Sequence, residues 1–532
     1  MLALLHSGAV RGVDACEIDL EVNIGHGDPH VTVVGLPDAA VKESADRVRT
    51  ALANSGYFPP KGRTTVNLAP ADLKKEGPAF DLAIALGMLA ADGQLVPAAR
   101  GGNSLFDERP RAPRGEPKDP AAFCVVGELA LSGAVRRVRG VLPIALRARA
   151  AGRKGILVTP ENAEEAAVVE GLDVFPVPTL RVAAEFLAGE RDIPPCRAEA
   201  ARAFAAGAAY EDDYADVKGQ EEARRAIEVA VAGGHNILLV GPPGTGKSML
   251  AKRIPSILPP LTLDEALETT KIHSIAGLLP PHQPLVLARP FRSPHHTISD
   301  AGLLGGGTNP LPGEASLAHN GVLFLDELPE FHRNVLEVMR QPLEDGEVTI
   351  ARANAIATFP CRFMLVAAMN PCPCGHYGDP RKACRCTPRQ IQQYRNRISG
   401  PLLDRIDLHV EVPALGFKDL ASLAPGEPSE AIRGRVVAAR ARQRERFAAA
   451  GKGGGTNAAM HPKEVRAACR LGEGASALLR AAREEMHLSA RAYDRILKVA
   501  RTIADLAGAD LIAEEHIAEA VQYRALDRQY WS

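Results

Sequence analysis

Residues 241–248 read Gly-Pro-Pro-Gly-Thr-Gly-Lys-Ser, which matches the phosphate-binding pattern G-x-x-x-x-G-K-S. The apolar run 237–240 precedes this loop as a predicted strand, and a predicted helix follows it. The backbone N–H groups of such a loop curl around phosphate oxygens, and glycine allows the close approach and positive φ that this needs. The sequence therefore predicts a nucleoside triphosphate site built from consecutive residues: Gly241, Pro242, Pro243, Gly244, Thr245, Gly246, Lys247, Ser248 and Met249.

A second apolar run, residues 321–325, ends in two acids, Asp326 and Glu327. An uninterrupted apolar run indicates a buried parallel strand, and ligands bind at the carboxyl ends of such strands. We expect Lys247 to reach the β- and γ-phosphates, and Ser248 and Asp326 to hold Mg²⁺. Glu327 is then placed to polarise the attacking water. ATP and Mg²⁺ are the expected cofactors.

A third apolar run, residues 362–369, is predicted as another buried strand and ends in Asn370. An amide at this position can hydrogen-bond the γ-phosphate or the attacking water. Two acids after a strand are, by themselves, weak evidence for a nucleotide site. When they follow a phosphate loop along the chain, they predict a P-loop α/β core.

The composition is that of a multidomain globular protein. The chain has 532 residues, which is more than one hydrophobic core usually serves, and 46% of them are hydrophobic. A net charge of −1 excludes a global attraction to nucleic acid, so any such contact must come from local basic groups. Residues 1–5 lack a basic leader and are predicted as a first strand, and no apolar run approaches the ~20 residues of a membrane helix. We expect a soluble, cytoplasmic protein.

Changes in composition divide the chain into four predicted parts. Residues 1–189 alternate short strands with helices, and residues 190–212 are alanine-rich and are predicted as a linker. The nucleotide-binding core is predicted over 213–413, and a helical lid over 414–532. A polar, proline-bearing stretch at 101–120 is predicted to be a mobile loop.

Several motifs together resemble the magnesium-chelatase-like AAA+ family, and within it the ComM/YifB group. They are GPPGTGKS (241–248), RPFRSPHHTISDAGLLGGG (289–307), GVLFLDELPEF (321–331), MNPCPCG (369–375), RISGPLLDRIDLHVEV (397–412) and SARAYDRILKVARTIADL (489–506). The resemblance covers nearly the whole chain. It implies a homo-hexameric, ATP-driven DNA helicase that promotes branch migration during recombination of incoming DNA in natural transformation. Its DNA would be single-stranded or branched and bound largely without regard to sequence.

Two other functions are compatible with an AAA+ core. One is a metal-insertion motor like the magnesium-chelatase ATPase subunit, and the other is a protein-remodelling chaperone. The N-terminal domain and a cluster of four cysteines argue against the first, because neither belongs to that subunit's pattern. Stimulation of ATP hydrolysis by DNA would separate a DNA motor from both.

One arginine in the core matches a residue that ring-forming AAA+ ATPases use across a subunit boundary. Arg405 precedes the predicted strand 408–412 and resembles the arginine finger, which reaches into a neighbouring subunit's site. A guanidinium suits the charge spread over the transferring phosphoryl group. The alternative is a surface ion pair with Asp404 or Asp407.

A second arginine lies in the predicted lid. Ser489 is predicted to cap a helix that begins just after it. By resemblance, Arg491 matches the second-sensor arginine of these ATPases. Arg495, one turn later, is the alternative.

Residues 1–189 are similar to the proteolytic domain of Lon proteases, which implies a Lon-type α+β fold. The similar segments are 76–81, 131–144 and 158–162. Lon cleaves peptides with a serine–lysine dyad, and the resemblance places Ala79 and Ile144 at those positions. Neither side chain can act as nucleophile or base, so we expect no peptidase activity and a role in assembly or substrate engagement. Ser44 and Lys42 offer a shifted dyad, which nothing in the sequence supports.

Four cysteines cluster directly after Asn370 with the spacing C-x-C-x₉-C-x-C: Cys372, Cys374, Cys384 and Cys386. Two short-spaced pairs suit a tetrahedral zinc ion with four thiolate ligands, and such a site is structural because no position stays open. His376 could replace one ligand. The alternative is a set of reduced thiols without metal. Cysteines have no packing reason to gather in a loop of this composition, which favours zinc.

Several basic segments are candidates for contact with DNA. The insertion around Arg292 and His295 and a predicted hairpin at 347–357, which carries Arg352, can grip phosphates independently of sequence. A basic face on the cysteine loop can contact DNA or a neighbouring subunit; it comprises Arg381, Lys382, Arg385 and Arg389. His295 and His296 are adjacent on a loop and lack a third metal ligand. The arginine-rich run 433–446 is predicted to be a solvated helix face.

Overall fold

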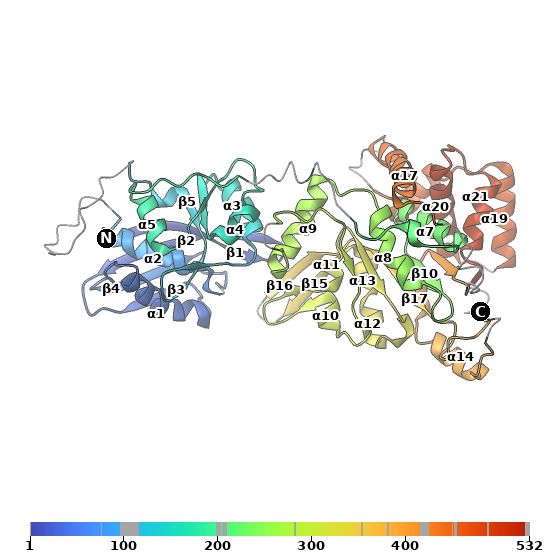
Figure 1. The fold of residues 1–532 in the computed structure, drawn as a ribbon, viewed down its shortest axis with the longest axis horizontal. Helices are drawn as coiled ribbons and strands as arrows, with labels where there is room; N and C mark the ends of the chain where they lie inside the picture. Colours follow the sequence, from blue (N-terminus) through green and yellow to red (C-terminus); the bar gives the residue numbers. More distant parts are fainter. Residues whose placement is uncertain are drawn as a thin grey trace. The chain divides into compact units, whose positions relative to one another are not determined.

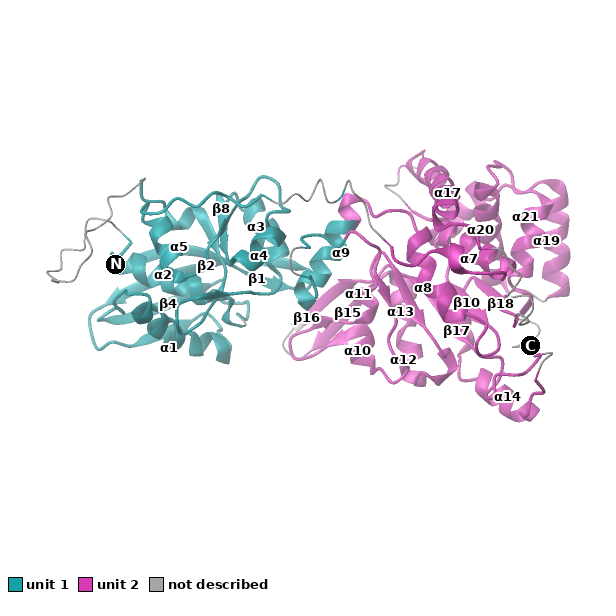
Figure 2. Ribbon diagram, in the orientation of Figure 1, with its two compact units in different colours: residues 1–206, 266–286 teal, residues 207–265, 287–532 magenta. Residues whose placement is uncertain are grey.

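The computed structural model shows two compact units (Figure 1, Figure 2). Unit 1 comprises residues 1–206 and 266–286, and unit 2 comprises residues 207–265 and 287–532. The structure describes residues 2–75, 77–95, 116–197, 204, 210–280, 283–352, 355–379, 382–414, 425–449, 451, 455–486 and 489–526. Residues 101–115 of the predicted mobile loop, 101–120, and residues 198–203 and 205–209 of the predicted linker, 190–212, lie outside these ranges.

Unit 1 is built on a mixed seven-stranded sheet. Its strands are, in spatial order, β3 (Val31–Val34), β4 (Arg63–Ala69), β2 (Asp14–Gly25), β1 (Leu2–Arg11), β5 (Phe123–Val125), β8 (Gly155–Val158) and β9 (Asp173–Pro176). Strands β6 (Glu128–Leu129) and β7 (Val135–Arg136) form a separate pair. The helices are α1 (Ala39–Asn54), α2 (Asp81–Ala91), α3 (Val141–Ala150), α4 (Pro160–Ala166) and α5 (Leu180–Leu187).

Helices cover both faces of the sheet around β5 and β8, whose residues are buried on both faces. Along β5, Phe123 and Val125 belong to the hydrophobic cluster that includes α1, α2 and α5, whereas Cys124 belongs to the cluster of α3 and α4. On β8, Leu157 belongs to the first of these clusters and Ile156 to the second. Side chains alternate between faces along a strand, so an unbroken apolar run fills two cores.

Residues 266–286 belong to unit 1, although the predicted nucleotide-binding core, 213–413, contained them. Most of helix α9 (Leu263–Ala276) lies in this segment. The hydroxyl of Ser274 donates a hydrogen bond to the buried carboxylate of Glu165, and Lys271 pairs with Asp14 at 3.1 Å. These contacts join positions far apart in the sequence, which explains why composition and spacing did not reveal them.

Unit 2 contains a five-stranded parallel sheet. Its strands are, in spatial order, β11 (Phe291–Arg292), β14 (Val322–Leu325), β17 (Met364–Met369), β10 (Ile237–Val240) and β18 (Leu408–Glu411). The helices of this core are α7 (Glu221–Gly233), α8 (Lys247–Ile257), α10 (Asp300–Leu304), α11 (Glu314–Leu317), α12 (Arg333–Val338), α13 (Arg340–Asp345), α14 (Pro388–Arg395) and α15 (Gly400–Leu403). Two short antiparallel pairs are β12 (Gly305–Gly306) with β13 (Leu311–Pro312), and β15 (Glu347–Arg352) with β16 (Ala355–Pro360).

The described C-terminal part of unit 2 is helical. It comprises α17 (Ser429–Ala449), α18 (Pro462–Ala468), α19 (Glu473–Glu485), α20 (Ala490–Leu506) and α21 (Glu514–Gln522). Buried residues of these helices, such as Val436 and Ile496, share one hydrophobic cluster with α7, α8 and the sheet. The predicted helical lid therefore packs on the predicted core.

The predicted α/β fold is confirmed, and the reason is visible in the strands. On β10, Ile237 and Leu239 face one cluster, while Leu238 and Val240 face the other. β14 and β17 alternate in the same way, so the apolar runs that predicted doubly buried strands do line two cores. Within the described part of the chain, no helix has both the length and the apolar character needed to cross a membrane.

Candidate active site

The chemistry-bearing segments of unit 2 meet at one edge of its parallel sheet. The phosphate loop, residues 241–248, follows β10, while Asp326 and Glu327 follow β14 and Asn370 follows β17. β17 lies between β14 and β10, and all three strands are parallel. Their carboxyl ends therefore form one edge, as in other sheets that bind nucleotides at the strand termini.

The phosphate loop requires glycine for two different reasons. Gly244 and Gly246 have φ values of 77° and 89°, in the left-handed region that glycine tolerates best. A Cβ atom on Gly241 would lie only 2.2 Å from the carbonyl oxygen of Val412, so that position needs glycine for close approach. Helix α8 begins at Lys247, and its free N–H groups and dipole therefore favour an anion in the loop.

Lys247 lies at the centre of the loop. Its Nζ atom donates hydrogen bonds to the carbonyl oxygens of Gly241 at 2.7 Å and Pro242 at 2.9 Å, and to Oδ1 of Asn370 at 3.2 Å. Burial lowers the pKa of Lys247 to about 8, against the opposing effect of Asp326 and Glu327. A phosphate in the loop would favour the charged ammonium for the same electrostatic reason.

Ser248 and Asp326 offer ligands for a divalent cation. The hydroxyl of Ser248 donates a 2.7 Å hydrogen bond to Oδ2 of Asp326, so two oxygen ligands converge beside the loop. Oxygen donors of this kind fit Mg²⁺, which proteins usually bind through one or two carboxylates together with phosphates. Glu327 has a φ of 52°, an uncommon value for a residue with a Cβ, and its side chain is 55% exposed. The carboxylate is thus accessible to water next to the cation ligands.

His296 also contacts this site, which the sequence did not indicate. Its Nδ1 atom lies 3.5 Å from Oε2 of Glu327, and its ring packs edge-on against Phe331. The sequence places His296 beside His295 in a basic insertion, without a third metal ligand. No local pattern connects positions 296 and 327, because the sheet and not the chain brings them together.

Arg405 lies near the amino ends of the parallel strands, opposite the carboxyl ends that carry the phosphate loop. The N–H groups of Asp407 and Leu408 donate to the carbonyl oxygen of Asn236, which directly precedes β10. Arg405 is therefore about 13 Å, the length of the four-residue strand β10, from the edge that carries its own phosphate loop. Its guanidinium donates to the carbonyl oxygen of Pro401 and pairs with Glu344.

The lid arginines differ in what they contact. Ser489 caps α20 as predicted, because its hydroxyl accepts a 3.1 Å hydrogen bond from the N–H of Ala492. Arg495 lies 3.3 Å from Asp407 in an ion pair, and burial lowers its pKa. Arg491 is exposed in the first turn of α20. It stays the candidate second-sensor arginine.

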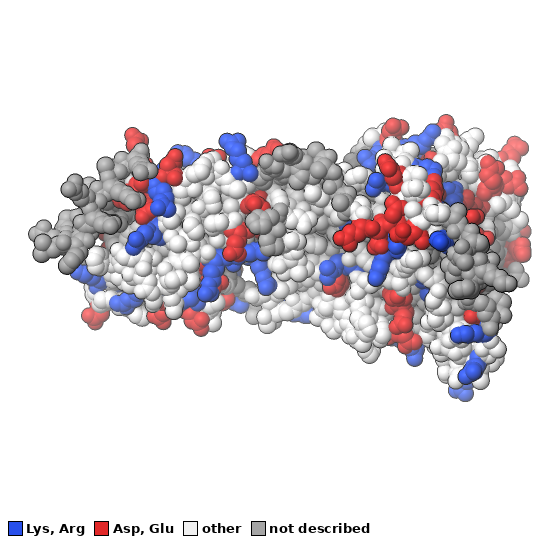
Figure 3. Space-filling view, in the orientation of Figure 1, with Lys and Arg blue, Asp and Glu red and all other residues white. Residues whose placement is uncertain are grey.

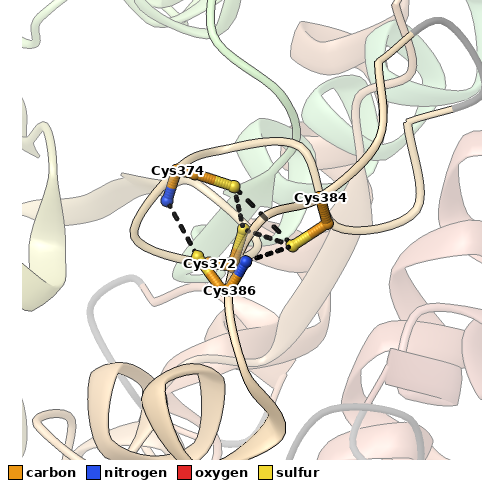
Figure 4. A group of neighbouring side chains, drawn as sticks. All are labelled: Cys372, Cys374, Cys384 and Cys386. Atoms are coloured by element: carbon orange, nitrogen blue, oxygen red, sulfur yellow. Dashed lines mark hydrogen bonds between the residues drawn. The ribbon is translucent and has the colours of Figure 1, made fainter.

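The four cysteines converge on one point (Figure 4). The Sγ atoms of Cys372 and Cys374 are 3.4 Å apart, and Sγ of Cys384 lies 3.7 Å from the first and 3.6 Å from the second. All four sulfurs, including that of Cys386, lie within 4.8 Å of one another. Four sulfurs on a tetrahedral zinc ion are about 3.8 Å apart, given Zn–S bonds of about 2.3 Å. The donor set and spacing fit zinc.

The candidate DNA-contacting residues lie in different surroundings. Arg292 makes a bidentate ion pair with Glu314, at 2.6 and 2.7 Å, and His295 hydrogen-bonds Thr297. Arg352 is exposed at the end of β15, in the predicted hairpin, which the pairing of β15 with β16 confirms. On the face that Figure 3 shows, acidic and basic side chains are interspersed, and basic ones gather over the region of α14. Arg381 lies outside the described residues.

The prediction that the run 433–446 forms a solvated helix face is confirmed for Arg435, Arg442 and Arg444, which are exposed, but Arg433, Arg440 and Arg446 are half-buried. Arg440 donates to the carbonyl oxygen of Val231, and desolvation lowers its pKa to about 9. Arg446 contacts Asn457 and the buried Asp505. Arg440 and Arg446 thus attach α17 to neighbouring segments. This packing could not be predicted from the sequence, because a charged residue type by itself indicates exposure to solvent.

The two positions that correspond to the Lon dyad are apolar and packed. Ile144, on α3, is buried in the cluster of α3 and α4, and Ala79 packs against the same cluster. Ser44, from the shifted pair considered above, donates to Asp81, which also receives hydrogen bonds from Arg47. Its hydroxyl is therefore engaged in a structural network.

Comparisons with known proteins match most of the chain. Residues 213–420 match the family model "Magnesium chelatase, subunit ChlI", 426–524 match its C-terminal model, and 20–103 with 112–162 match "Subunit ChlI of Mg-chelatase". The chain is 45% identical to the YifB protein of Escherichia coli over 528 residues, which is 99% of this chain and 98% of that one. It is 45% identical to the competence protein ComM of Haemophilus influenzae over 531 residues, with the same coverage. Lon protease 2 of Bacillus subtilis is 30% identical over 162 residues, 26% of each chain.

Proposed function

The chain belongs to the magnesium-chelatase-like AAA+ family, and from that premise we propose that it is an ATP-driven motor that forms a hexameric ring on DNA. Its task in this proposal is branch migration during recombination of incoming DNA, the setting that the name of the similar competence protein indicates. Metal insertion and protein remodelling are the alternatives.

One observation carries the ring: the two halves of the proposed catalytic machinery lie at opposite edges of the same sheet. Lys247, Ser248, Asp326, Glu327 and Asn370 share the carboxyl edge, and Arg405 precedes the amino end of β18. A guanidinium placed there acts on a nucleotide only across a subunit boundary. Heterologous contacts of this kind form a ring when the rotation between subunits closes, and each subunit then completes its neighbour's site.

Within each site the side chains have separable tasks. Bound ATP and Mg²⁺ supply the phosphoryl chemistry. Lys247 neutralises phosphate charge, Ser248 and Asp326 hold the cation, and Glu327 orients a water and accepts its proton. Arg405 of the adjacent subunit stabilises the charge that develops on the phosphoryl oxygens.

The β15–β16 hairpin supports the choice of DNA as the substrate. It presents Arg352 and Ile356 to solvent, and the side chain of Ile356 is 63% exposed. One such hairpin per subunit would place a ring of cations around a channel, which suits a phosphate backbone of any sequence. Aromatic residues make up only 4% of the chain, so backbone contacts are favoured over base stacking.

Purified protein is expected to dissociate a synthetic four-way DNA junction when ATP is present, and DNA is expected to stimulate its ATP hydrolysis. Arg352→Ala should weaken DNA binding and lower the slope of log affinity against log salt by about one per hairpin in contact. Arg136→Ala is a matched control, because Arg136 is an exposed arginine of unit 1. An ATPase rate that DNA does not change, together with DNA binding that Arg352→Ala does not weaken, would favour metal insertion or protein remodelling.

We also propose that the four cysteines bind one structural Zn²⁺ ion, since a full thiolate shell leaves no position for a substrate. Metal analysis of the purified protein should find about one zinc per chain, and Cys384→Ser should lower this value. Cys196→Ser is the control, because Cys196 is also partly exposed and lies outside the cluster. Zinc content that is zero in the wild type, or unchanged in Cys384→Ser, would contradict the assignment.

A further inference from the structure

The cysteine loop is attached directly to the nucleotide site. Its first cysteine, Cys372, is buried and comes two residues after Asn370, whose amide oxygen accepts a hydrogen bond from Lys247. Pro371 lies between them, and its carbonyl oxygen accepts hydrogen bonds from two nitrogens of Arg395, each at 3.2 Å. A displacement of Cys372 is thus transmitted to Asn370 through a short, anchored segment.

The loop also packs against the phosphate loop itself. Gly375 has a φ of 82°, and a Cβ atom there would lie 2.6 Å from both Cδ and Cγ of Pro243 and 3.9 Å from Cγ of Asn370. The backbone that follows Cys374 therefore lies directly on the ring of Pro243, with no room for a further atom. Gly375 therefore approaches both the phosphate loop and Asn370, the residue that follows β17.

The far side of the loop is anchored as well. Cys386 is followed by Thr387, which caps α14 in a reciprocal capping box with Gln390. Arg395, the last residue of α14, is the side chain that binds Pro371, and its guanidinium lies 5.1 Å from the ring centre of Tyr377. The cysteines are thus the point where both ends of the loop are joined.

We propose that the zinc-bound cysteine loop braces the ATP site: the metal fixes Gly375 against Pro243 and Asn370 and thereby holds the phosphate loop in its binding conformation. Gly375 is a positioning residue in this scheme, because it acts through Pro243. The inference rests on the proposed zinc and ATP sites. It adds that nucleotide affinity depends on the metal, although no cysteine contacts the nucleotide.

The chain offers a matched pair of variants. Gly375 and Gly378 lie in the same loop with φ values of 82° and 80°, so alanine strains the backbone equally at both. A Cβ on Gly378 meets nothing within 4 Å, whereas one on Gly375 meets Pro243. The difference between the two variants therefore isolates the contact with the phosphate loop.

We expect Gly375→Ala to bind a fluorescent ADP analogue about tenfold more weakly than Gly378→Ala, at equal zinc content and melting temperature. Pro243→Ala lacks the two clashing ring atoms, so adding it to Gly375→Ala should recover part of the loss relative to Pro243→Ala alone. Removing zinc from the full-length protein with a chelator, in excess Mg²⁺, should weaken ADP binding, and zinc should restore it.

The outcomes distinguish a failure of this inference from a failure of the proposed ATP-driven function. Equal ADP affinity of Gly375→Ala and Gly378→Ala, or unchanged affinity after zinc removal, overturns the brace while leaving the ATP motor intact. Wild-type protein that binds no ADP overturns the proposed function and the brace together. If Gly375→Ala does not fold, the chelation and zinc-restoration measurement decides alone.

Discussion

Glu327→Gln is expected to abolish ATP turnover while ATP still binds. The substitution keeps the size of the side chain and removes only the carboxylate that orients and deprotonates water, a contribution of about 10²- to 10⁴-fold in rate. Binding should persist because the groups that hold the phosphates, Lys247 and the N–H groups of the loop, are unchanged. The measurements are steady-state phosphate release and calorimetric titration with ATP.

Glu330→Gln is the matched control for this experiment. Glu330 lies three positions further along in the short helix Leu328–Glu330 and pairs with Arg397 at 2.8 Å. An exposed ion pair of this kind contributes little, so turnover should stay near the wild-type rate. Retained turnover in Glu327→Gln, or equal loss in both variants, would remove Glu327 from its assigned task.

The sequence predicted those parts of the site that depend on strands and on the residues directly after them. Lys247, Asp326 and Asn370 each follow an apolar run of a parallel strand, and parallel strands end at a common edge, so their meeting could be inferred. The same apolar runs predicted the doubly buried sheet, and residues 347–357 separately predicted the β15–β16 hairpin.

The parts that escaped prediction are contacts between segments without a shared periodicity. His296 meets Glu327, and Gly375 meets Pro243, through tertiary packing that leaves no spacing pattern in either segment. The partial burial of Arg440 has a related cause. An arginine on a predicted helix is normally solvated, but here the half-buried guanidinium donates to the carbonyl oxygen of Val231 on α7.

Arg405→Ala is expected to lower ATP turnover by about 10³-fold or more, the usual contribution of an arginine that stabilises phosphoryl transfer from a neighbouring subunit. Nucleotide binding by the isolated subunit should be nearly unchanged, because Arg405 lies at the sheet edge away from its own phosphate loop. Arg397→Ala is the control, since Arg397 forms an exposed ion pair in the same segment.

Mixing two inactive variants tests the trans arrangement more sharply than either variant alone. Glu327→Gln retains Arg405, and Arg405→Ala retains Glu327, so a boundary at which the first donates its arginine to the second carries a complete site. Random rings from equal amounts should contain about one such boundary in four and regain turnover accordingly. The double variant, mixed with either single variant, forms no complete boundary and should stay inactive. If the mixture of single variants also stays inactive under conditions where rings assemble, Arg405 does not act across the subunit boundary, because that arrangement requires complementation.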